Sequence, residues 1–283
     1  MTVVGALDIG GTHVAAARVR LTSKTVDARL RLAFTGDAKP LERILEAARS
    51  IATTEMRRFG VAVPGPFDYE QGVSLVTHKL HGLYGVDVRR ELALALGLTD
   101  SAACFLNDAE AFLLGEWWAG AARGHTRAVG ITLGSGLGSA FLEDGRPVRS
   151  GVPADGELFR LLFRGRPVED TISRGALLAR YGADSKTDVE QIAERARAGE
   201  PRASRVFEEV GADLVDFLAA PLEAFRPTCL VVGGSIARAW HLIGPGLARG
   251  FATQTRLLVT RAANIDDAAL LGAARHAGRQ PGL

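Results

Sequence analysis

Apolar residues form two kinds of pattern along the chain. Short continuous runs, typical of buried strands, fall at residues 3–9, 14–17, 30–34, 58–63, 103–106, 128–133, 139–143, 229–232 and 256–260. Helical spacing of apolar residues falls at residues 41–51, 86–96, 109–122, 187–225, 236–247 and 266–277. Strands and helices that are mixed along the whole chain predict an α/β protein.

Three of the strand-like runs end in glycine turns. These turns are Gly10-Gly11-Thr12, Gly134-Ser135-Gly136 and Gly233-Gly234-Ser235. Glycine leaves backbone N–H groups uncovered, so a phosphate can approach them. One such turn is equally compatible with an ordinary hairpin, whereas three in one chain favour a nucleotide ligand. The P-loop pattern is absent, and residues 134–138 lack the glycine spacing and the following helix of a dinucleotide fingerprint.

The order of strand, glycine turn, strand and second turn occurs twice, at the start of the chain and again from residue 128. Such an internal repeat predicts two related halves. We expect an N-terminal domain of residues 1–107, completed by the last helix at 266–283, and a larger C-terminal domain of residues 108–265.

Two carboxylates are candidates for chemistry. Asp8 lies at the end of the first strand, beside the first glycine turn, where it can hold a hydrated Mg²⁺. Asn107-Asp108 stand where a buried strand stops and a helix starts. Functional groups favour such strand ends, but Asn and Asp are also good helix caps, so both roles remain open. Phosphoryl transfer to a hydroxyl needs a carboxylate that takes its proton, and Asp108 is the best-placed candidate.

Taken in order, several segments resemble the ROK family of the actin, Hsp70 and sugar-kinase superfold. The matching segments are Leu7–Thr12, Val63–Pro66, Asn107–Ala111 with Gly115-Glu116, Gly130–Gly138 and Val231–Ile236. The resemblance implies two ribonuclease-H-like, actin-like ATPase domains with a cleft between them. It also implies transfer of the γ-phosphate of ATP to a hexose hydroxyl.

The resemblance carries roles onto individual positions of this chain. It implies that Asp108 is the general base, that Asp8 holds Mg²⁺ through water, and that the cofactors are ATP and Mg²⁺. The sugar is expected at Gly65, Asn107, Glu157 and Glu169. The nucleotide and its phosphates are expected at Asp8, Gly10, Gly11, Thr12, Thr132, Gly134, Ser135, Gly136, Gly233 and Gly234. By analogy with the family we also expect a homodimer.

The chain departs from the family pattern around the expected sugar and zinc positions. Arg160 stands where a zinc- and sugar-binding His is usual, and residues 165–170 lack the cysteines of the family's zinc motif. A structural zinc needs about four N or S ligands, so we expect no zinc site. His78, Lys79 and His81 occupy a segment that differs from the family's Asn-Leu-x-Gly-Trp. They either contact an anionic or unusual sugar or belong to a solvated loop.

Charge and composition limit the kinds of partner that we expect for this chain. The formal net charge is +2 with no block of like charge, so we expect no nucleic-acid partner. The chain begins in a strand without a signal peptide and has no apolar run of about 18 residues. We therefore expect a cytoplasmic protein without membrane contact. Cys104 and Cys229, each beside apolar residues, are expected to be buried thiols, and Trp117 and Trp118 are expected to pack rather than to stack on a sugar.

Two alternatives to an ATP-dependent kinase remain open. The chain is also compatible with a catalytically weak sugar sensor of the same family, and with a kinase that uses polyphosphate as donor. A DNA-binding regulator is not expected, because Asp8 comes so early and no basic recognition helix is seen.

Overall fold

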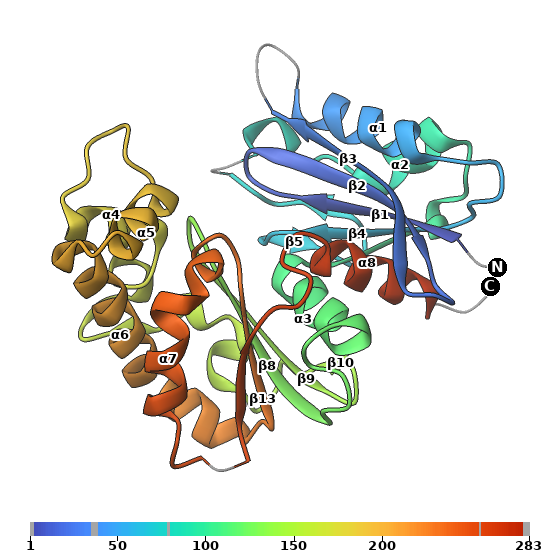
Figure 1. The fold of residues 1–283 in the computed structure, drawn as a ribbon. Helices are drawn as coiled ribbons and strands as arrows, with labels where there is room; N and C mark the ends of the chain where they lie inside the picture. Colours follow the sequence, from blue (N-terminus) through green and yellow to red (C-terminus); the bar gives the residue numbers. More distant parts are fainter. Residues whose placement is uncertain (1–2, 35–38, 78–79, 255, 280–283) are drawn as a thin grey trace. The chain divides into compact units, whose positions relative to one another are not determined.

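The computed structural model describes residues 3–34, 39–77, 80–254 and 256–279. The chain divides into two compact units (Figure 1). The first unit contains the residues up to Gly120 together with those from Asp266 onward, and the second unit contains Ala121–Ile265.

Each unit is built on a five-stranded sheet. In spatial order the first sheet consists of β3 (Thr25–Ala33), β2 (His13–Arg20), β1 (Val3–Ile9), β4 (Phe59–Val63) and β7 (Ala103–Asn107). The second consists of β10 (Arg146–Pro147), β9 (Leu137–Glu143), β8 (Arg127–Leu133), β13 (Cys229–Gly233) and β14 (Leu258–Arg261). In both sheets the first two pairings are antiparallel and the last two are parallel. This shared topology confirms the two related halves and the α/β class.

Helices cover both faces of the first sheet (Figure 1). The helices of this unit are α1 (Pro40–Ile51), α2 (Val88–Leu96), α3 (Asp108–Ala119) and α8 (Ala268–Gly278). Leu7 and Ile9 of β1 belong to the buried cluster beneath α1 and α2. Because side chains alternate along a strand, Asp8 points to the opposite face, against which α8 packs.

Helices α3 and α8 contact each other almost backbone to backbone. A Cβ atom on Gly115 would lie 1.9 Å from the carbonyl oxygen of Ala268, and one on Gly272 would lie 1.8 Å from that of Ala111. A domain boundary after residue 107, as expected from the sequence, would separate these two helices. In the structure the first unit instead continues to Gly120, since α3 packs on α8.

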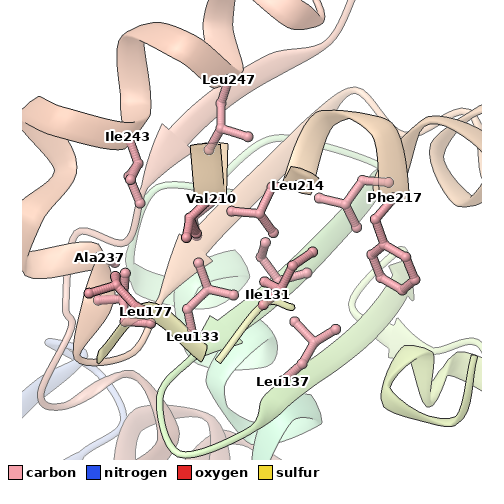
Figure 2. Close-up of a cluster of buried hydrophobic side chains, with 14 of the residues drawn as sticks. Ile131, Leu133, Leu137, Leu177, Val210, Leu214, Phe217, Ala237, Ile243 and Leu247 are labelled. Atoms are coloured by element: carbon pink, nitrogen blue, oxygen red, sulfur yellow. The ribbon is translucent and has the colours of Figure 1, made fainter. Parts of the chain in front are cut away.

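Among the described residues, four helices of the second unit share one buried core with its sheet. These are α4 (Arg174–Tyr181), α5 (Val189–Arg197), α6 (Pro201–Phe225) and α7 (Trp240–Gly250). Figure 2 shows Ile131 and Leu133 of β8 facing Leu214 of α6, with Ile243 and Leu247 of α7 completing the cluster. The sequence pattern predicted the strands and most of these helices. It missed α4 and the two-residue strands β5 (Phe67–Asp68), β6 (Val73–Ser74), β10, β11 (Leu162–Phe163) and β12 (Arg166–Pro167).

Several side chains outside the glycine turns match their expected packing. Cys104 and Cys229 are free, buried thiols. Trp118 is buried, with the guanidinium of Arg275 5.5 Å from its ring centroid, and Arg279 lies 5.4 Å from the ring of Trp117. Within the described ranges, no helix is both long and apolar enough to cross a bilayer.

Candidate active site

The first glycine turn joins β1 to β2. The Gly10 N–H donates to the carbonyl oxygen of His13 at 2.9 Å, and the Phe34 N–H donates to that of Thr12 at 2.8 Å. A Cβ atom on Gly10 would lie 3.3 Å from Cε1 of the His13 ring. Glycine is favoured at this position because the ring approaches the backbone closely, not because the turn needs a left-handed residue.

Asp8 and Asp108 act on each other within the first unit. Asp8 is partly buried at the end of β1. Burial, and next the negative charge of Asp108, raise the pKa of Asp8 from 3.8 to about 7, while the guanidinium of Arg31 has the opposite effect. The carboxylate of Asp108 and the guanidinium of Arg31 are therefore both near enough to Asp8 to change its pKa.

Asn107 and Asp108 begin α3 at the end of β7. The Oδ1 atom of Asn107 accepts hydrogen bonds from the N–H groups of Ala109 and Glu110, at 2.9 and 3.3 Å. The carboxylate of Asp108 also accepts from the Ala109 N–H, at 2.9 Å. Capping, which the sequence left open for these two residues, is thus observed for Asn107. Asp108 keeps partial exposure at the helix start.

Tyr69 connects the expected sugar residues of the first unit, and the sequence pattern did not indicate it. Nδ2 of Asn107 donates to the Tyr69 hydroxyl at 3.3 Å, and this hydroxyl donates to the carbonyl oxygen of Val63 at 3.2 Å. A Cβ atom on Gly65 would lie 3.5 Å from the same hydroxyl. Gly65, Tyr69 and Asn107 therefore form one cluster near the start of α3.

The second and third glycine turns meet within the second unit. Thr132 of β8 pairs with Gly233 of β13. Gly234 has a φ of +82°, and a Cβ atom there would lie 2.4 Å from the carbonyl oxygen of Leu133. On the other side, a Cβ atom on Gly134 would lie 3.7 Å from Oγ of Ser235. Only glycine can adopt the left-handed backbone of Gly234 while lying so close to Leu133.

Glu169 lies at the second glycine turn. Its Oε1 atom accepts a hydrogen bond from the Leu137 N–H at 2.8 Å. A Cβ atom on Gly136 would lie 2.2 Å from the same oxygen. Glu169 was expected at the sugar, and its carboxylate also orders the turn that was expected at the phosphates.

Glu157 lies on a segment whose backbone is hydrogen-bonded to β9. The Ser139 hydroxyl donates to the carbonyl oxygen of Gly156 at 2.6 Å and accepts from the Leu158 N–H at 2.8 Å. The guanidinium of Arg160 forms an ion pair with Glu157 at 3.4 Å. Both side chains are about half exposed, so this pair contributes little to stability.

The expected absence of zinc stays a prediction. Among the residues that the structure describes, no three His, Cys, Asp or Glu side chains gather into a group that could hold a metal ion. His78 and Lys79 lie outside the described residues, as does the side chain of His81.

The two sheets share one topology, and a glycine turn joins β1 to β2 in the first and β8 to β9 in the second. These features define the actin-like ATPase class of fold. The structure superimposes on a ROK family glucokinase from Streptomyces griseus, solved with glucose and AMPPNP, with a TM-score of 0.82 and 21% identity over 98% of this chain and 100% of that chain. The sequence profile of the ROK family matches residues 4–279, and the chain belongs to this family.

Two curated relatives of this chain are named as sugar kinases. It is 28% identical to the glucokinase of Thermotoga maritima in an alignment of 272 positions that covers 84% of either chain. It is also 28% identical to the N-acetylmannosamine kinase of Escherichia coli in an alignment of 293 positions that covers 95% of this chain and 96% of that one.

Proposed function

We propose that this chain is an ATP-dependent sugar kinase that transfers the γ-phosphoryl group to a hexose hydroxyl, the primary one at carbon six. The observation that carries the proposal is the carboxylate of Asp108 at the start of α3, close enough to Asp8 at the first glycine turn for its charge to raise the pKa of Asp8. A base for a hydroxyl and a backbone turn for phosphates are the two parts that phosphoryl transfer requires. The kinase activities of the relatives agree with this chemistry.

In the proposed reaction, Asp108 takes the proton of the acceptor hydroxyl. The hydroxyl oxygen forms a bond to the γ-phosphorus, the bond from phosphorus to the bridging oxygen breaks, and ADP leaves with that electron pair. Backbone N–H groups of the glycine turns stabilise the charge on the phosphoryl oxygens. We assign the residues Gly10, Gly11, Thr12, Thr132, Gly134, Ser135, Gly136, Gly233 and Gly234 to the nucleotide and its phosphates.

The residues around Asp8 fit a divalent cation. Burial and the charge of Asp108 both disfavour the ionised form of Asp8, which is the condition that a bound cation relieves. We propose that Asp8 holds hydrated Mg²⁺, which supplies charge neutralisation on the phosphate oxygens when bound.

The acceptor residues are proposed to be Gly65, Asn107, Glu157 and Glu169. Asn107 keeps one amide N–H beyond the hydrogen bond to Tyr69, and this donor suits a sugar hydroxyl. We add Tyr69 to this set, because its hydroxyl fixes the orientation of the Asn107 amide.

Asp108→Asn tests the proposed base. We expect this variant to lose about 10²–10⁴-fold in kcat for ATP-dependent phosphorylation of glucose, mannose or N-acetylmannosamine. Binding of AMPPNP should change little, because the amide keeps the hydrogen bond from Ala109. Asp188→Asn is the matched control: Asp188 also begins a helix and accepts a hydrogen bond from Gln191, but lies in the second unit. Full turnover in Asp108→Asn would refute the assignment.

The same assay separates the alternatives. Transfer from polyphosphate, with none from ATP, would replace the donor in the proposal. Sugar binding with no transfer from either donor by the wild-type chain would identify a sugar sensor.

A further inference from the structure

Arg31 of β3 lies in one row with Asp8 across the first sheet. Asp8 of β1 is paired with Ala15 of β2, and Ala15 is paired with Arg31. Cross-strand partners project from the same face of a sheet, so Asp8 and Arg31 share a face with only a methyl group between them. The Arg31 side chain can therefore extend over Ala15 toward the carboxylate, and its charge indeed lowers the pKa of Asp8.

His13 links Arg31 to the first glycine turn. Its Nδ1 atom lies 3.4 Å from Nη2 of Arg31 and 3.1 Å from Oγ1 of Thr12. A guanidinium only donates, so Nδ1 accepts and the proton of the neutral ring resides on Nε2. Burial, and next the charge of Arg31, lower the pKa of His13 below 6.5, which keeps the ring neutral at pH 7.

This arrangement leaves N–H groups of Arg31 and His13 available to a ligand beside the first glycine turn. Arg31 is exposed, and the ion pairs formed among the described residues do not include it. Arg29, two residues earlier on the same face, is instead paired with Asp267 at 3.1 Å. The remaining guanidinium N–H groups of Arg31 and the Nε2–H of His13 thus adjoin the first glycine turn. A planar guanidinium fork matches the oxygens of a phosphate.

We propose that Arg31 and His13 bind the terminal phosphoryl group of the phosphate donor at the first glycine turn. This inference rests on the proposed function. The ligand chemistry is the end of a phosphate chain, whether that chain belongs to ATP or to inorganic polyphosphate. Arg31 offsets the charge that Asp8, Asp108 and the donor bring together, and His13 holds the guanidinium in place while donating its own N–H.

The decisive measurement is the binding of AMP, ADP and AMPPNP by isothermal titration calorimetry to the wild type, Arg31→Ala, Arg31→Lys and His13→Ala. Charge-assisted hydrogen bonds are worth enough that Arg31→Ala should weaken AMPPNP about 10–100-fold. AMP, which has no terminal phosphoryl group, should bind unchanged. Arg31→Lys should recover part of the loss, and His13→Ala should lose about 3–10-fold.

Arg29→Ala is the matched control. It removes an arginine from the same strand and face, and should leave AMPPNP binding and donor KM unchanged within about twofold, because Arg29 serves an exposed pair with Asp267. Binding of inorganic tripolyphosphate shows which donor is used. If polyphosphate is the donor, Arg31→Ala should weaken the binding of tripolyphosphate and leave the binding of AMPPNP unchanged.

Steady-state kinetics separate this inference from the proposed function. In Arg31→Ala the donor KM should rise and kcat fall while the sugar KM stays constant. Equal weakening of AMP and AMPPNP, or unchanged donor binding in Arg31→Ala, would overturn the role of Arg31 in an active enzyme. A wild-type chain that transfers no phosphoryl group would instead overturn the proposed function.

Discussion

The carboxyl group of Asp8 has an unusually high pKa because it is buried near a second carboxylate. Its pKa is raised to about 7, first by burial and then by Asp108. A folded chain therefore holds a proton at Asp8 that the unfolded chain releases above about pH 4. Folding stability from this group falls as the pH rises from about 4 to 7, and is fully lost above 7.

Asp8→Asn should abolish the loss of folding stability that the wild type shows between about pH 4 and 7. The shift of Asp8 from 3.8 to about 7 is about 3 pKa units, and one unit corresponds to about 1.4 kcal/mol. We therefore expect the variant to be more stable than the wild type by about 4 kcal/mol at pH 8 and by about 1.5 kcal/mol at pH 5. Urea unfolding at the two pH values, without nucleotide or divalent cation, measures the difference. Asp184→Asn is the control: hydrogen bonds from Thr187 and Lys186 lower the pKa of this exposed carboxylate, so its effect should not vary between pH 5 and 8. A pH-independent effect of Asp8→Asn would contradict the argument.

Residues around the candidate site were predictable where the signal is local. Asp8 and the glycine turns are read from consecutive positions, because a turn and the strand before it are adjacent in sequence. Arg31 became apparent only through the pairing of β3 with β2, which includes a register shift between Arg18 and Val19. A one-residue change in register would move Arg31 to the other face of the sheet. The hydrogen bond between Tyr69 and Asn107 spans 38 residues of sequence and gives no local signal at all.

At the scale of elements, the packing of α8 on α3 depends on two glycines. A Cβ atom on Gly272 would lie 1.8 Å from the carbonyl oxygen of Ala111, and neither backbone can move without disturbing the sheet beneath. Gly246 of α7 gives a matched comparison, because no atom lies within 4 Å of a Cβ atom placed there.

Gly272→Ala and Gly246→Ala should have opposite effects on stability. We expect the first to destabilise the fold by about 2–3 kcal/mol, as overpacking does. The second should stabilise it by about 0.5–1 kcal/mol, because alanine restricts the unfolded chain and favours the helix. Chemical denaturation of both variants measures this, and two effects of the same sign and size would contradict the close contact.

Elements with a sustained period were predictable, and irregular segments were not. The helix α1 and the strand β13 follow apolar patterns that extend over several turns or a whole strand. Between residues 150 and 187 the chain forms short 3₁₀ turns, two-residue strands and the eight-residue α4. Ala154, Asp155 and Arg164 adopt positive φ values there. Neither a two-residue strand nor a left-handed alanine leaves a periodic pattern in the sequence.

At the scale of the whole molecule, the chain builds one topology twice and returns to the first unit with its last helix. The core of the second unit is formed by residues between Val129 and Phe251, without any contribution from α8. The first unit needs α8, whose Leu270, Ala273 and Ala277 are fully buried. The part of the first unit that contains Asp8 and Asp108 therefore depends on residues at the other end of the chain.

A chain that stops after Ile265 tests this dependence. It keeps every proposed site residue, yet we expect it to lose phosphotransferase activity and the cooperative unfolding of the first unit. Trp117 and Trp118 report on that unit, because Arg279 and Arg275 cover their rings. In a Trp240→Phe background their emission should shift to longer wavelength after truncation, as water reaches the indoles. With both of them replaced by Phe, the emission of Trp240 in α7 should stay constant, because the second core is intact. Unshifted emission of Trp117 and Trp118, with activity retained, would show that the first unit forms without α8.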